Sequence, residues 1–260
     1  MKTYIQKIKE HLADYKVHVL KINENGIWLN NKQQYTHILP LNLYFKNLID
    51  EGYYKELYDI ASTIKRHCNF HHLNSSQALA INLFGLMQAE NDFSILQDNG
   101  IEISNYIYSK FEYKESDDTT FDFYIKTQIR NIYFEIKYTE KTIATESKSK
   151  NNEYRWSQYY EAPMISMLKD TTNVKELFFS QYQLWRNIVR ISNNNDIVVF
   201  VFPSVRNDLK AEVVRAIEKV KPEYAHHIKI LHIDAICKSG ENHDKFFSHY
   251  VEFKNKYLKF

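Results

Sequence analysis

The sequence has 260 residues, 44% hydrophobic and 15% aromatic, which excludes a disordered chain and is enough for a proper core. A formal net charge of +2 excludes a strongly basic protein, so any polyanion binding must depend on local basic patches. Cys68 and Cys237 are too few for a disulfide framework or a four-cysteine zinc site, and they fit a reducing compartment.

The first 69 residues predict a small α+β extension. Residues 3–14 have the period of an amphipathic helix, and residues 17–28 alternate like a hairpin with Asn25-Gly26 as its turn. Residues 43–65 again have a helical period. The charged amino terminus lacks the apolar stretch of a secretory signal, and no segment approaches the roughly 18 apolar residues of a membrane span. We expect a cytoplasmic protein without a membrane partner.

The next segment contains His and Cys side chains at positions 67–72, but no second ligand pair at zinc spacing follows them. Asn74 or Ser75 is a suitable N-cap for a helix that continues to Met87. Gln77 lies in the first turn of this helix, where its amide can point into a cleft.

Residues 119–140 predict two strands of alternating character joined by a short polar turn. On the first strand, Phe121, Phe123 and Ile125 share one face, and Asp122, Tyr124 and Lys126 share the other. On the second strand, Ile132, Phe134 and Ile136 oppose Tyr133, Glu135 and Lys137. If the strands pair, Asp122, Glu135 and Lys137 converge on one patch of the sheet.

This combination of two carboxylates and an ammonium suits metal-assisted hydrolysis of a phosphodiester. Asp122 and Glu135 offer the hard oxygen ligands that Mg²⁺ prefers, and the ion would activate water and bridge phosphate oxygens. Lys137 would orient that water or stabilise the charge of the transition state. Mn²⁺ is the expected substitute for Mg²⁺.

The Glu-x-Lys pattern occurs three more times, at Glu112-Tyr-Lys114, Glu146-Ser-Lys148 and Glu252-Phe-Lys254. Glu252 is the strongest alternative because Asp234 stands on a plausible preceding strand. It lies too near the end of the sequence for the helix and strand that should follow. Only Glu135 has a helix and an Asp-bearing strand before it and a helix and a strand after it.

The second half continues the pattern of alternating helices and strands. Residues 141–158 predict a long polar loop whose basic side chains, Lys148 and Arg155 among them, could follow a phosphate backbone. Residues 175–191 predict a helix with an apolar face and a polar stripe of Gln183, Arg186, Asn187 and Arg190. Residues 196–203 predict a strand buried on both faces, residues 206–219 a helix and residues 226–236 a strand.

The arrangement of Asp122 before Glu135-Ile-Lys137 resembles the PD-(D/E)xK nuclease superfamily, with Phe121 in place of the proline. Residues 70–203 further resemble a bacterial, restriction-endonuclease-like branch of it. The motifs that carry this resemblance, in order, are Ser75-Ser76-Gln77-Ala78, Phe111-Glu112, Asp122, Glu135-Ile136-Lys137 and Gln183-Leu184-Trp185-Arg186-Asn187.

The resemblance implies an α/β fold with an α-β-β-β-α-β core, a mixed central sheet flanked by helices, over residues 70–260. It also implies that Glu112 is a further metal ligand and that Gln77 positions groups around the metal. Gln183 and Arg186 would contact phosphate or orient Glu135.

The predicted function is therefore a Mg²⁺-dependent endonuclease that cuts DNA, of restriction or phage-defence type. The alternative is a non-catalytic nucleic-acid-binding protein that retains this fold, and the intact Asp, Glu and Lys argue against it. Only five glycines are present, and neither a phosphate-binding glycine loop nor a nucleophile elbow is found. Two-fold symmetric DNA sites would favour a homodimer.

Overall fold

The computed structural model describes residues 2–49, 52–145, 150–192 and 195–260. The chain forms two compact units. Met1–Ile103 and Ile233–Phe260 make up the first, here called the helical unit, and Ser104–His232 make up the second, the sheet unit. The expected boundary between residues 69 and 70 falls inside the helical unit and stays a prediction.

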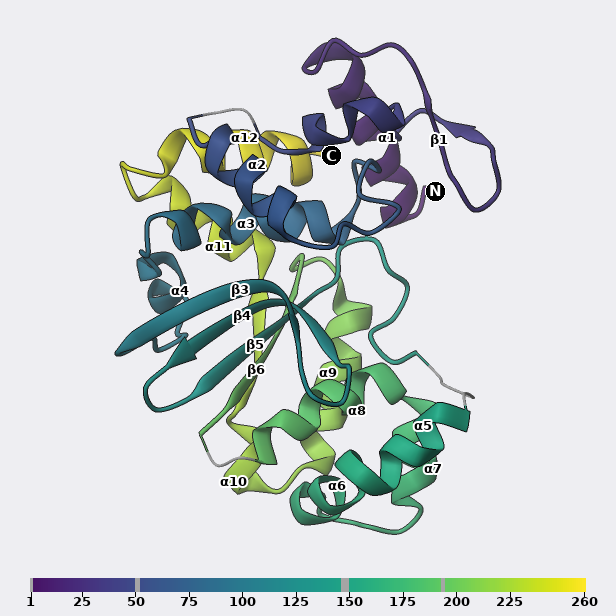
Figure 1. Ribbon diagram of the computed structural model, residues 1–260, viewed down its shortest axis with the longest axis vertical. Helices are drawn as coiled ribbons and strands as arrows, with labels where there is room; N and C mark the ends of the chain where they lie inside the picture. Colours follow the sequence, from purple (N-terminus) through teal and green to yellow (C-terminus); the bar gives the residue numbers. More distant parts are fainter. Residues whose placement is uncertain (1, 50–51, 146–149, 193–194) are drawn as a thin grey trace. The chain divides into compact units, whose positions relative to one another are not determined.

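The sheet unit is built on a mixed sheet of five strands (Figure 1). In spatial order these are β3 (Tyr106–Lys114), β4 (Thr120–Thr127), β5 (Asn131–Ile136), β6 (Ile197–Phe202) and β7 (Ile228–His232). The first three are antiparallel, whereas β6 runs parallel to both β5 and β7. All six residues of β6 are apolar and buried, as expected for a parallel strand with a neighbour on each side. The predicted α/β fold with a mixed central sheet is confirmed.

Helices of the sheet unit pack on one face of this sheet around a common apolar core, to which Tyr133, Trp185 and Phe200 belong. The segments are α5 (Lys150–Arg155), a π-helical turn (Trp156–Tyr160), α6 (Glu161–Met167), α7 (Val174–Ser180), α8 (Tyr182–Ile188), a 3₁₀ turn (Val189–Ser192), α9 (Asn207–Lys219) and α10 (Pro222–Ala225).

Two sequence predictions for these helices are wrong. The expected loop over residues 141–158 contains α5 and most of the π-helical turn. The expected helix over residues 175–191 is broken at Gln181, whose φ of −133° and ψ of 44° are not helical. The polar stripe is also not all exposed, because Asn187 is fully buried.

The strict alternation predicted for β4 fails at Asp122. Phe111 and Phe123 pack against each other with ring centroids 4.6 Å apart, whereas Phe121 packs on Tyr133 at 4.7 Å, within the core that faces the helices. On β3 the interruption coincides with Glu112, which has a left-handed φ of 50°. A residue in that conformation interrupts the pleat, so the side chains beyond it change faces.

The helical unit contains seven α- or 3₁₀-helical segments among the described residues, with a two-stranded ribbon. Its elements are α1 (Tyr4–His18), β1 (Gly26–Ile27), β2 (Gln34–Tyr35), a 3₁₀ helix (Leu41–Asn47), α2 (Tyr54–Thr63), α3 (Ser76–Ala89), α4 (Ser94–Asp98), α11 (Ile233–Glu241) and α12 (Phe247–Tyr257). Ser75 caps α3 as predicted, by accepting a hydrogen bond from the backbone of Ala78. None of the helices that the structure describes is long and apolar enough to span a bilayer.

The expected hairpin over residues 17–28 is wrong in its register. Residues up to His18 belong to α1, and Gly26 is a strand residue that pairs with Tyr35 instead of forming a turn. Glycine is needed there because a Cβ atom would lie 2.0 Å from the carbonyl oxygen of Leu39. The strand expected over residues 226–236 is also shorter, because α11 begins at Ile233.

A lysine is buried in the helical unit. Lys256 is 1% exposed, and its ammonium donates to the backbone oxygen and, at 2.9 Å, to the side-chain Oδ1 of Asn47. Burial lowers the pKa of Lys256 to about 7. The unfolded chain therefore binds this proton more tightly than the folded protein does.

We expect the free energy of unfolding to rise with pH between about 7 and 10, by about 1 kcal/mol per pH unit from this lysine. The reason is that the unfolded chain stays protonated there while the folded protein does not. Urea denaturation of Lys256→Met at pH 7.5 and 9.5 should show a smaller rise than the wild type. Lys254→Met, on the partly exposed side of the same helix, is the control that should keep the rise. An equal rise in Lys256→Met and wild type would contradict the prediction.

Candidate active site

The predicted catalytic carboxylates lie on adjacent strands at the point where β4 and β5 separate. The regular pairing ends at Phe123 and Phe134. Just beyond, Asp122 Oδ2 accepts a 2.6 Å hydrogen bond from the backbone N–H of Ile136. The Asp122 carboxylate thus takes the place of the next backbone carbonyl as acceptor. This hydrogen bond holds the carboxylate against β5, the strand that carries Glu135.

Glu135 and Lys137 form a buried ion pair. Lys137 Nζ lies 2.8 Å from Glu135 Oε1, and the two side chains are only 10% and 6% exposed. Strand β6 fixes their backbone, since Glu135 pairs with Phe200 and the Lys137 N–H donates to the Val201 carbonyl at 2.9 Å. Both side chains project to the same face because they are two positions apart along an extended chain.

A third side chain reaches this pair from α8. Gln183 Nε2 donates to Glu135 Oε1 at 2.9 Å, and Gln183 Oε1 accepts from the Thr145 hydroxyl at 3.2 Å. One oxygen of Glu135 therefore receives both the ammonium of Lys137 and the amide of Gln183. These donors fix the orientation of the carboxylate from two sides.

The loop after β5 is held by two residues of the α9 region. Arg206 donates to the carbonyl oxygens of Tyr138 and Glu140, at 3.0 and 2.7 Å. Glu212 accepts from the backbone N–H groups of residues 143 and 144, at 2.8 and 3.2 Å. Neither role could be predicted from the sequence, because both residues look like ordinary charges at the start and on the face of a helix.

The charges at this site are unbalanced. Burial, followed by the nearby charge of Glu135, raises the pKa of Asp122 well above its ordinary value. Burial alone would lower the pKa of Lys137, but the charges of Glu135, Glu140 and Asp122 outweigh it and raise that pKa. One ammonium thus faces several carboxylates, and a further cation would relieve their repulsion.

The donor set suits a hard divalent cation that keeps part of its water shell. Within the described ranges, the hydrogen bonds of Asp122 and Glu135 use one oxygen of each, which leaves Asp122 Oδ1 and Glu135 Oε2. No group of three His, Cys, Asp or Glu side chains that could hold a metal is found among those residues. Mg²⁺ does not need such a cage, since one or two carboxylates, water and substrate phosphate complete its shell.

Glu112 stands near this pair. It lies between Phe111 and Tyr113, which pair with the two neighbours of Asp122 on β4. Its charge contributes to raising the pKa of Asp122. Its positive φ is an unfavourable conformation for glutamate, and such backbone strain is often found at functional sites. Its role as a metal ligand stays a prediction.

The remaining predicted residues have other partners in the structure. Gln77, in the helical unit, accepts from the His67 N–H at 2.8 Å and donates to the Lys65 carbonyl at 3.2 Å. Arg155 forms a 2.6 Å ion pair with Asp118, and the Arg186 guanidinium lies 5.4 Å from the centre of the Tyr182 ring. Lys148 lies outside the described residues. The functional roles expected for these four stay predictions.

The alternative Glu-x-Lys sequence, at Glu252, does not lie on a strand. Glu252 lies on α12 and accepts a hydrogen bond from the Tyr15 hydroxyl at 2.5 Å. Asp234, expected on a preceding strand, lies in the first turn of α11. Helices in place of strands remove the shared sheet face that this alternative requires.

In a comparison with family models, residues 9–258 match the family described as restriction endonuclease associating with ARP. No curated protein and no solved structure matches the chain significantly. The match covers nearly all of the sequence, including every residue of the pair of strands described above. The chain belongs to this family of restriction endonucleases.

Proposed function

We propose that the protein is a Mg²⁺-dependent endonuclease that hydrolyses DNA, of restriction or phage-defence type. The observation that carries the proposal is the arrangement of Asp122, Glu135 and Lys137 at the separation of β4 and β5. Its orientation by Gln183 and its excess of negative charge support the same chemistry. Membership of a restriction endonuclease family supports DNA as the substrate.

Asp122 and Glu135 would hold the ion through the oxygens that their other hydrogen bonds leave. A bound Mg²⁺ would supply a more acidic water and neutralise charge on the phosphate. Because its pKa is raised, Lys137 keeps its proton at neutral pH. Its role is that of a fixed positive charge, which orients the nucleophile and stabilises the pentavalent phosphate.

We expect cleavage of unmethylated plasmid and phage DNA with Mg²⁺ or Mn²⁺ and none with EDTA, as observed by gel electrophoresis. Discrete fragments would identify sequence-specific cleavage, and a smear would identify a non-specific nuclease. A protein that binds DNA but cleaves none with either ion would contradict the proposal and favour the non-catalytic alternative.

A further inference from the structure

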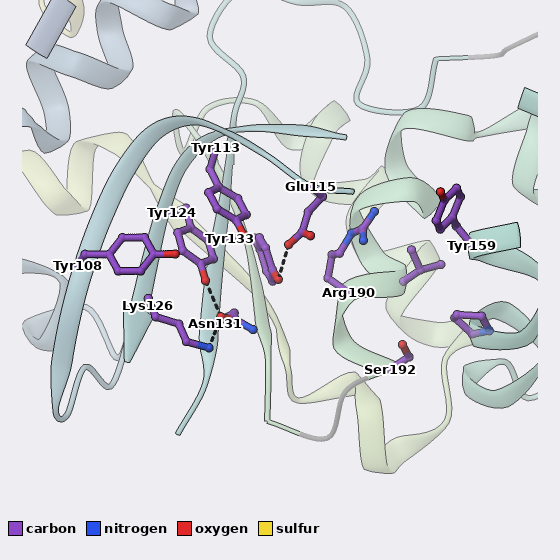
Figure 2. Close-up of a pocket in the computed structure, with 12 residues that line it drawn as sticks. Tyr108, Tyr113, Glu115, Tyr124, Lys126, Asn131, Tyr133, Tyr159, Arg190 and Ser192 are labelled. Atoms are coloured by element: carbon purple, nitrogen blue, oxygen red, sulfur yellow. Dashed lines mark hydrogen bonds between the residues drawn. The ribbon is translucent and has the colours of Figure 1, made fainter. Parts of the chain in front are cut away.

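A pocket rich in tyrosine opens between the sheet and the helices of the sheet unit. Its volume is about 510 Å³, within the range of small-molecule sites. Figure 2 shows four tyrosines on the strand side and Tyr159 and Arg190 on the helix side. The four are Tyr108, Tyr113, Tyr124 and Tyr133.

The tyrosine rings offer flat surfaces at the pocket wall and rim. Tyr113 and Tyr124 are stacked, with centroids 3.8 Å apart and planes 8° from parallel. Tyr108 and Tyr159 are each 42% exposed, although both line the pocket. Exposed aromatic faces of this kind can stack on a planar ring.

Polar groups of the pocket are held in fixed positions. Asn131 Oδ1 accepts from the Tyr124 hydroxyl at 2.5 Å and from Lys126 Nζ at 2.9 Å. The Tyr133 hydroxyl donates to Glu115 at 2.8 Å (Figure 2). Lys126 and Glu115 thus provide a donor and an acceptor with restricted freedom, as needed to hydrogen-bond the edge of a heterocycle.

The pocket and the candidate active site share strand β5 and one face of the sheet. Tyr133 precedes Glu135 by two residues on β5, so both project to the face of the sheet that the helices cover. At about 3.3 Å per residue, their Cα atoms are roughly 7 Å apart. Of the pocket tyrosines, Tyr133 lies nearest to Glu135 along the strand, whereas Tyr108 lies level with Asn131, four residues before Glu135. A nucleic-acid strand with a phosphate at Glu135 would therefore follow β5 to bring one of its bases into the pocket.

We propose that this pocket binds one unpaired nucleobase of the nucleic acid whose phosphate lies at the candidate active site. The inference rests on the proposed function and adds to it a preference for a base that is single-stranded or turned out of the duplex. A paired base is stacked on both faces, so it cannot offer them to tyrosine rings.

The test measures binding without cleavage, by fluorescence anisotropy of a labelled single-stranded oligodeoxynucleotide in EDTA. The protein is the full chain carrying Glu135→Gln. Tyr108→Ala and Tyr159→Ala should each weaken binding by about ten-fold, the effect of losing base–aromatic stacking. Tyr108→Phe should retain the affinity, since it keeps the ring. Tyr58→Ala, which removes a tyrosine of similar exposure on α2, should also retain it.

A set of oligonucleotides with one abasic position each provides the second measurement. At one position, loss of the base should weaken binding to the parent protein but not to Tyr108→Ala. Affinity that is insensitive to both tyrosines and to every abasic position would overturn the base pocket, even if the wild type cleaves DNA. If the wild type never cleaves DNA but binding still depends on the tyrosines, the base pocket is supported and the nuclease proposal is overturned.

Discussion

Glu135→Gln should slow DNA cleavage by more than about 100-fold, beyond the effect usual for loss of an outer-shell partner of a metal. The amide can keep a contact with Lys137 but lacks the charge that a divalent cation requires. Single-turnover assays with saturating enzyme and Mg²⁺ would measure the rate. Lys137→Met should slow cleavage to a similar extent, because it removes a positive charge from the reacting phosphate.

Thermal unfolding with and without Mg²⁺ separates the role of Glu135 as a metal ligand from the role of Lys137 as a positive charge. Mg²⁺ should raise the unfolding temperature of wild type and Lys137→Met, and it should not raise that of Glu135→Gln, which lacks a ligand. Glu252→Gln is the matched control, since it changes the Glu of another Glu-x-Lys sequence that lies on a helix. Cleavage at the wild-type rate by Glu135→Gln would show that the carboxylates are wrongly assigned.

Arg190→Met should destabilise the protein by about 3–5 kcal/mol, the usual effect of removing one partner of a buried ion pair. Arg190 pairs with Asp117, whose side chain is fully buried, and also donates to the Thr119 hydroxyl at 3.2 Å. Burial would raise the pKa of Asp117, but the charge of Arg190 reverses this and lowers it. Without the arginine, a carboxylate is left buried and unpaired. Urea denaturation at pH 7 would measure the loss.

The neighbouring ion pair of Asp118 and Arg155 is more exposed, so it shows how much burial contributes to the stability provided by the Asp117–Arg190 pair. Its side chains are 50% and 29% exposed, so Arg155→Met should cost at most about 1 kcal/mol. The double variant Asp117→Asn, Arg190→Met should recover part of the stability lost in Arg190→Met, because no charge stays buried. An equal decrease in the free energy of unfolding of Arg190→Met and Arg155→Met would show that burial does not make the Asp117–Arg190 pair the more stabilising of the two.

Local patterns in the sequence were sufficient to predict most strands of the sheet. The two strands predicted within residues 119–140 are β4 and β5, and the strand predicted over residues 196–203 is the buried parallel strand β6. Period-two alternation also placed Glu135 and Lys137 on one face, where they form their ion pair. These features depend only on neighbours in the chain, so a single sequence contains them.

Features that depend on distant contacts or on unusual backbone angles were missed. The left-handed φ of Glu112 and the break at Gln181 follow from packing, since neither residue is a glycine or a proline. The pair of Asp117 and Arg190 joins a turn to a segment 73 positions away. No periodicity connects two such residues, so the sequence alone could not indicate this ion pair.

The division of the helical unit into two stretches of chain affects the order in which the protein can fold during synthesis. The sheet unit is continuous and can fold once residue 232 has left the ribosome. The helical unit must wait, because α12 supplies partners to the almost entirely buried α3. Asn82 donates to the Tyr257 hydroxyl at 2.8 Å, and the Tyr250 hydroxyl donates to the Leu83 carbonyl at 2.7 Å. Until those residues emerge, the apolar surface of α3 lacks its native cover, and nascent chains in that interval would depend most on chaperones.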